Sequence, residues 1–142
     1  SLRRQRQMCI RDSGDDKGLK IPPKIAPTQV VIIPINPKNE KSEEFSNFIT
    51  SVEEKLSHLS IRTHIDDLDE SPGFKFNKWE LKGVPIRIEI GVREFENKEV
   101  TVCRRDNSEK NQLEIHIHLF LLHVLHYLLR ELNKYCLVGV RK

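Results

Sequence analysis

The residues best able to do specific chemistry lie between positions 71 and 91, in the stretch SPGFKFNKWELKGVPIRIEIG. Aromatic and lysine side chains alternate here, a mixture that can stack on unpaired bases and hold phosphates. The residues predicted to stack or to contact a nucleic-acid backbone are Lys75, Lys78, Trp79 and Lys82. The alternative is that Trp79, Phe74 and Phe76 form a small core beneath a loop.

Two acids and two arginines in and just after this stretch have a more specific interpretation. Guanine offers N–H donors on one edge, and O6 and N7 acceptors on another. A carboxylate accepts from the first edge, and an arginine donates to the second, often through two bonds. Glu80, Arg87, Arg93 and Glu94 supply this mixture. The same residues could instead form surface ion pairs.

The possible catalytic groups form no convincing set. Asp15 and Asp16 are adjacent, so they rarely share a face, and no partner base follows them. Cys103 lies in an expected strand, where alternation turns it toward the core and favours a buried structural thiol. The six glycines are scattered and form no phosphate-binding loop. The sequence of the chain by itself therefore indicates no catalytic site.

Histidines near the end of the chain offer one alternative. His116 and His118 share a strand face, while His123 and His126 lie three apart on an expected helix, a spacing that can bind zinc. No cysteine or carboxylate completes the set at a familiar spacing. We therefore expect no metal and keep a small metal-binding protein as a minor alternative.

The composition favours one globular domain. The chain has 142 residues, 37% of them hydrophobic and 32% charged. Its longest mostly apolar run, residues 115–129, contains four of the six histidines, which argues against a membrane span. The three cysteines are far apart and odd in number, which excludes a disulfide scaffold and fits the reducing cytoplasm.

The net charge of +3 is confined to one end of the chain. Residues 1–13 carry four arginines against one aspartate, so the remaining body is neutral. Met8–Ser13 reads MCIRDS, which resembles the translation of a sequencing adapter. We interpret residues 1–13 as an adapter-derived artefact, with a disordered basic arm as the alternative.

Strands and helices must position the candidate residues. Residues 29–35 read as a strand buried on both faces. A helix follows Ser42, with one apolar face formed by Phe45, Phe48, Ile49, Val52, Leu56 and Leu59. Residues 61–65 and 84–90 read as strands, separated by a loop leading into a short helix at 72–83. Residues 99–105 and 112–117 form an expected hairpin, and 118–135 a final helix. This order predicts an α/β fold with a mixed sheet.

Three blocks, in order, resemble the eukaryotic and archaeal type of prolyl-tRNA synthetase. They are GDDKGLKIPPKIAPTQVVIIPI at 14–35, the stretch at 71–91, and CRRDNSEK at 103–110. The resemblance implies that residues 14–27 leave a class II catalytic domain and that residues 28–135 form an anticodon-binding domain, followed by a tail at 136–142. The implied domain is a five-stranded mixed sheet flanked by about three helices.

The resemblance also implies which residues recognise the two guanines shared by proline anticodons. By motif position these are Glu80, Arg87, Arg93, Glu94 and Lys110. The family usually has Gly-Pro-Arg-Asp where this chain has Gly91-Val92-Arg93-Glu94. The lost proline loosens the turn, and Glu94 reaches one methylene further than aspartate.

The implied function is that of a fragment of a proline–tRNA ligase. The parent enzyme would attach proline to proline tRNA with ATP and Mg in the cytoplasm, as a homodimer formed through the catalytic domain. Class II motifs 1–3 and the family's zinc-bearing C-terminal domain are missing, so we expect an inactive fragment without a cofactor. The alternative is a free-standing RNA-binding paralogue of the domain.

Overall fold

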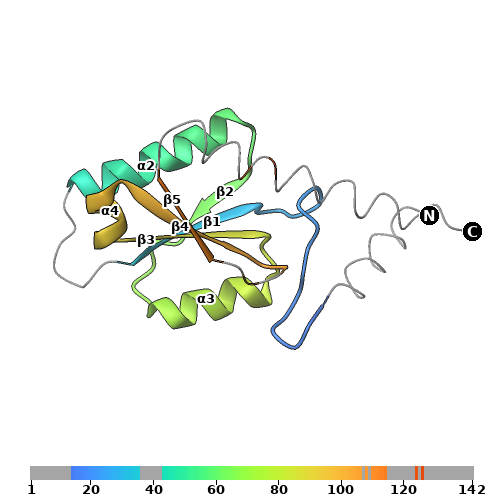
Figure 1. Ribbon diagram of the computed structural model, residues 1–142. Helices are drawn as coiled ribbons and strands as arrows, with labels where there is room; N and C mark the ends of the chain where they lie inside the picture. Colours follow the sequence, from blue (N-terminus) through green and yellow to red (C-terminus); the bar gives the residue numbers. More distant parts are fainter. Residues whose placement is uncertain are drawn as a thin grey trace, which may run out of the picture.

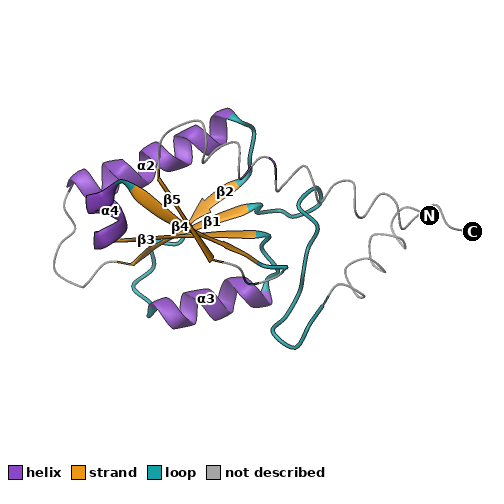
Figure 2. Cartoon of the chain, viewed as in Figure 1, coloured by secondary structure: helices purple, strands orange, loops and turns teal. Residues whose placement is uncertain are grey.

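The computed structural model describes residues 14–35, 43–106, 108, 110–114, 124 and 126, and it shows a mixed sheet between helices (Figures 1 and 2). The elements are β1 (Val30–Ile35), α2 (Glu43–His58), β2 (Thr63–Ile65), α3 (Pro72–Leu81), β3 (Ile86–Gly91), α4 (Val92–Asn97), β4 (Glu99–Arg104) and β5 (Lys110–Glu114). Among the described residues, these five strands and three helices confirm the predicted fold class.

The sheet has the strand order β2-β1-β3-β4-β5. β1 pairs in parallel with both β2 and β3, while β3, β4 and β5 pair antiparallel. The chain crosses from β1 to β2 through α2 and from β2 to β3 through α3, so these two helices cover opposite faces of the sheet (Figure 1). The hairpin of β4 and β5 extends the sheet beyond α3.

The larger core lies between the sheet and α2. Apolar side chains of α2 recur every three or four residues and are buried at Phe45, Ile49, Val52 and Leu56. They pack against β-branched residues of β1, β3 and β4, and the buried Val124 joins the same core. Leu59, which we predicted on this face, is 37% exposed because α2 ends at His58 and the chain turns at Ser60 with a positive φ.

A smaller core lies on the other face of the sheet, beneath α3. Val31 and Ile33 of β1 point to this side, which confirms that β1 is buried on both faces. Trp79 packs against them together with the half-buried Phe76, while Phe74 of the same helix is 56% exposed.

Two helical segments differ from the sequence-based prediction. Residues 72–81, expected to begin as a loop, are helical throughout, because the Ser71 hydroxyl accepts a hydrogen bond from the Phe74 N–H and Pro72 starts the first turn. The helix α4 was not predicted, because six residues are too few for a clear apolar period. It ends at Asn97, and the left-handed backbone of the next residue, Lys98, terminates the helix.

The segment before β1 lies against the end of α3. The Leu19 N–H donates to the Leu81 carbonyl over 3.3 Å, and the Ile21 N–H donates to the Gly83 carbonyl over 3.1 Å. The Gly18 backbone has φ +135°, and a Cβ there would lie 2.6 Å from the Leu81 Cα, so only glycine fits. The segment therefore packs against the sheet domain.

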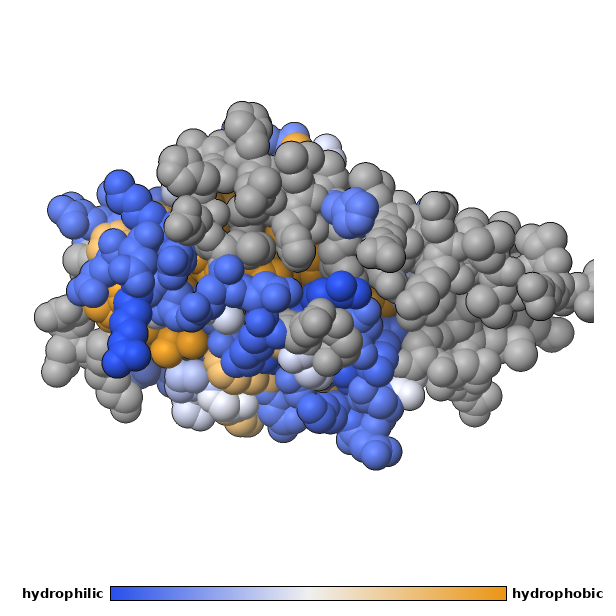
Figure 3. All heavy atoms as spheres, in the orientation of Figure 1, coloured by the Kyte–Doolittle hydropathy of each residue, from blue (hydrophilic) through white to orange (hydrophobic). Residues whose placement is uncertain are grey.

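Several predicted features fall outside the described residues. They are residues 1–13, Ser42, and the tail and final helix except Val124 and His126, which are both helical. The hairpin is confirmed, with its second strand beginning at Lys110. On the face in Figure 3, hydrophilic side chains cover most of the described surface. No helix in the described ranges is long and apolar enough to cross a membrane.

Candidate nucleic-acid interface

Arg87 is the centre of a side-chain cluster on the α3 face of the sheet. Alternation along β3 directs Arg87 and Glu89 to this face, while the neighbouring isoleucines face α2. Arg87 Nη1 donates to Glu80 Oε1 and its Nε donates to Glu89 Oε1, both over 3.0 Å. Its guanidinium carbon lies 4.3 Å from the centre of the Phe76 ring. Contacts to β3 and α3 thus fix the arginine.

Lys110 joins this cluster from β5. In the sheet register Arg87 lies opposite Cys103, and Cys103 lies opposite Lys110, so three neighbouring strands align these side chains. Lys110 Nζ lies 3.1 Å from Glu89 Oε2 and 5.5 Å from the centre of the Phe76 ring. We call Phe76, Glu80, Arg87, Glu89 and Lys110 the guanidinium cluster.

Cys103 lies beside the cluster as a buried thiol. Arg87 Nη2 lies 3.5 Å from its sulfur. Burial raises the pKa of the Cys103 thiol, so it is protonated near neutral pH and is a poor nucleophile. This agrees with the structural role predicted from the sequence.

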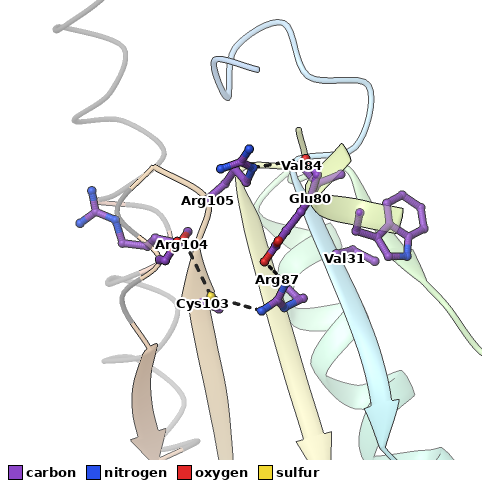
Figure 4. A pocket seen from close by; sticks show the side chains of 9 residues that line it. Val31, Glu80, Val84, Arg87, Cys103, Arg104 and Arg105 are labelled. Carbon is purple, nitrogen blue, oxygen red and sulfur yellow. Dashed lines mark hydrogen bonds and ion pairs between the residues drawn. The ribbon is translucent and has the colours of Figure 1, made fainter. Parts of the chain in front are cut away.

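A shallow hollow opens between the cluster and the end of α3. Figure 4 shows Glu80 and Arg87 directed toward each other, with Cys103 beside Arg87 and the Arg104 side chain pointing away. The lining residues are Val31, Trp79, Glu80, Val84, Arg87, Cys103, Arg104, Arg105 and Ser108. The hollow has a volume of about 10 Å³, room for about one water molecule. The hollow is therefore too small to hold a ring the size of a nucleic-acid base.

The aromatic and lysine residues of α3 divide into buried and surface groups. Trp79 is 7% exposed, and its indole N–H donates to Asp66 Oδ2 over 2.5 Å. The buried Lys75 donates to the Asp66 carbonyl, and Lys78 forms an ion pair with the Asp66 carboxylate. The ammonium nitrogen, Nζ, of the exposed Lys82 lies 4.2 Å from the centre of the Trp79 ring. Burial of Trp79, with Phe76 packed beside it, favours the small-core interpretation for these two aromatic residues, whereas the exposed Phe74 lies outside that core.

We call Asp66, Lys75 and Trp79 the inner group. Asp66, which directly follows β2, accepts hydrogen bonds from both of the other residues. Burial opposes its ionisation, but the hydrogen bonds from Trp79 and Lys78 prevail and hold the pKa of the carboxyl below its ordinary value. The second oxygen, Oδ1, is buried without a hydrogen-bond partner among the described residues. The sequence predicted only a loop at this position, so Asp66 was missed.

Arg93 and Glu94 lie apart from the guanidinium cluster, on α4 beyond the other end of β3. Glu94 Oε2 accepts from the Gly91 N–H over 3.0 Å, and Oε1 lies 3.5 Å from the Thr101 hydroxyl. The side chain of the exposed Arg93 forms no hydrogen bond or ion pair within the described part of the chain. The structure thus brings Glu80, Arg87 and Lys110 together and places Arg93 and Glu94 separately.

The metal alternative rests on His116, His118, His123 and His126. Three of the four histidines lie outside the described residues, and His126 is exposed. Within the described ranges no three metal-ligating side chains come together.

Comparison with known proteins decides the family. A profile described as "Anticodon binding domain" matches residues 29–118, which include every strand and helix described above. The chain belongs to the anticodon-binding domain family.

Relatives of this anticodon-binding domain are proline–tRNA ligases. The chain is 53% identical over 97 residues to the ligase of Pyrococcus abyssi and 50% identical over 102 residues to that of Methanococcoides burtonii. These matches cover 68% and 72% of the chain but only 20% and 21% of the relatives. The chain thus spans about a fifth of the length of its curated relatives.

A solved relative confirms the fold of the domain. Prolyl-tRNA synthetase from Cryptosporidium parvum, complexed with L-proline and AMP, superposes with a TM-score of 0.78 at 41% identity. The superposition covers 88% of this chain and 27% of that structure. The predicted family and fold are therefore confirmed.

Proposed function

We propose that this chain is the anticodon-binding part of a proline–tRNA ligase and that its guanidinium cluster recognises guanines of the anticodon. The observation that carries the proposal is the ion pair between Glu80 and Arg87, which places an acceptor side chain directly beside a donor side chain. Glu80 is 27% exposed and Lys110 52%, so both remain accessible to RNA.

The cluster has the groups that two guanine edges require. The Glu80 carboxylate would accept from the base N–H donors, while Arg87 and Lys110 would donate to O6 and N7. Arg87 has five N–H groups, and its contacts to Glu80, Glu89 and Cys103 leave donors unused. Lys78 and Lys82 at the surface of α3 would contact phosphates, while Lys75 and Trp79 would support them from inside. Arg93 and Glu94 would extend the surface beyond β3.

The activity of the whole protein is proposed from its relatives. It would attach proline to tRNA with ATP and Mg, in the cytoplasm and as a homodimer, through a catalytic domain outside this chain. Binding energy at the anticodon would favour the cognate tRNA at that distant active site.

Binding of an RNA hairpin to the 142-residue chain tests the proposed recognition. We expect tighter binding to a hairpin that carries a proline anticodon than to one with both guanines replaced by adenine. Arg87→Ala should reduce this preference by about 1–3 kcal/mol. Lys55→Ala, which removes a cation from α2 on the opposite face, serves as the control. Equal binding of both hairpins to the unaltered chain would contradict the proposal.

A further inference from the structure

Glu89 connects the two cations of the guanidinium cluster. Its Oε1 accepts from Arg87 Nε over 3.0 Å, and its Oε2 lies 3.1 Å from Lys110 Nζ. The Glu89 and Arg87 side chains are 9% and 10% exposed, whereas the Lys110 side chain is 52% exposed. One inner carboxylate thus binds a buried cation with one oxygen and an accessible cation with the other.

Both partners of Glu89 depend on it for their orientation. Nε is the guanidinium nitrogen closest to the Arg87 stem, so an acceptor at this position fixes the direction of the whole planar group. Lys110 has a flexible four-carbon stem, and the ion pair with Glu89 holds its ammonium group beside the Phe76 ring. Without Glu89, the Lys110 ammonium group would be free to turn into solvent.

We infer that Glu89 is a positioning residue that presents Arg87 and Lys110 together to the guanines, an inference that rests on the function proposed above. Glu80 and Glu89 then have different tasks. Glu80, the more exposed acid, exchanges its contact to Arg87 for one to the base. Glu89, the inner acid, keeps both ion pairs while RNA is bound, and the remaining Arg87 donors face the base.

A simpler possibility makes the opposite prediction. If Glu89 only neutralises its neighbours, it repels the RNA phosphates and competes for Arg87 and Lys110. Removing its charge would then tighten the binding of every RNA and leave the preference for guanine unchanged. A positioning role instead requires that the preference itself decreases.

The experiment measures dissociation constants of the 142-residue chain and its variants for hairpins with the guanine and the adenine anticodon. For Glu89→Gln we expect the ratio of the two constants to fall about tenfold, since one oriented base contact is lost. Glu96→Gln removes an equal charge from an exposed position on α4 and should leave the ratio unchanged. Because Glu89 acts through Lys110, Lys110→Met should lower the ratio much less in the Glu89→Gln background than alone.

Each outcome decides between the two roles. An unchanged ratio with tighter binding of both hairpins to Glu89→Gln would overturn the positioning role and leave the proposed function intact. If the unaltered chain shows no preference for guanine, the proposed function itself fails. Should Glu89→Gln not fold, Glu89→Asp tests the positioning role instead, because its shorter side chain keeps the charge but cannot reach both cations. The Glu89→Asp variant should lose part of the preference for the guanine hairpin, and a full preference would overturn the inference.

Discussion

The Arg105 guanidinium donates two hydrogen bonds, of 2.9 and 2.5 Å, to the carboxylate of Asp15, ninety residues earlier in the chain. The same guanidinium donates through Nε to the Glu80 carbonyl over 3.3 Å. Arg105 therefore connects the segment that precedes β1 with the end of the helix that carries Glu80. Lys20 adds an ion pair of 3.1 Å to the same Asp15 carboxylate.

This ion pair makes stability depend on pH. The hydrogen bonds from Arg105 hold the pKa of the Asp15 carboxyl well below its ordinary value. A lowered pKa stabilises the folded state fully at pH values above the ordinary pKa. This contribution is lost progressively as the pH falls from the ordinary pKa towards the lowered one. We expect Asp15→Asn to lower the free energy of unfolding at pH 7 and to have progressively less effect below about pH 4. Urea titrations at several pH values measure this, with Asp16→Asn, at an exposed neighbour, as the control. A constant effect of Asp15→Asn across this range would contradict the assignment.

A substitution at Gly18 tests whether the segment before β1 packs against the end of α3. Alanine at position 18 would meet the backbone of Leu81 and would need a left-handed φ, so we expect Gly18→Ala to cost about 1–3 kcal/mol. Gly73→Ala is the matched control, because a Cβ there meets nothing within 4 Å and position 73 lies in the first turn of α3. It should be neutral or stabilise by up to about 1 kcal/mol. Thermal unfolding measures the stability of both variants, and equal changes in stability would contradict the packing of Gly18 against Leu81.

The long elements could be predicted from the sequence because their apolar periods are long. The β-branched run at β1 and the spacing along α2 both correspond to buried faces of the structure. Alternation in the run VPIRIEI at residues 84–90 likewise indicates that Arg87 and Glu89 share one side of β3, as they do in the structure. The short helix α4 has no comparable period, and its limits depend on local turns at Gly91 and Lys98.

Contacts between distant residues could not be predicted from any local pattern. The row of Arg87, Cys103 and Lys110 depends on the register of three strands, which the sequence does not specify by itself. Burial of Trp79 depends likewise on Asp66, thirteen residues earlier, which supplies an acceptor inside the protein. The sequence therefore indicates which residues have side chains suited to recognise guanine. Only the fold shows which of these side chains are buried and which are accessible.

Asp66 provides a test of that inner group. Replacing it with alanine removes the acceptor of the buried Trp79 N–H and one carboxylate partner of Lys78, so we expect a loss of about 2–4 kcal/mol. Lys78 keeps its ion pair with Glu70, which limits the loss. Asp66→Asn retains an acceptor for Trp79 and should cost less than the alanine variant. Urea denaturation followed by tryptophan fluorescence measures both, and equal losses would indicate that the indole hydrogen bond contributes nothing.

Glu94 allows a structural contribution to be separated from RNA recognition. Its carboxylate accepts from the Gly91 N–H at the start of α4, so Glu94→Ala should lower the free energy of unfolding by about 1 kcal/mol. Glu94→Gln keeps an oxygen acceptor for this bond and should retain most of the stability. If Glu94 also recognises guanine, the glutamine variant loses the charged acceptor and should bind the guanine hairpin less tightly than the unaltered chain does. Full stability together with an unchanged guanine preference in Glu94→Gln would restrict Glu94 to the α4 turn and limit recognition to the guanidinium cluster.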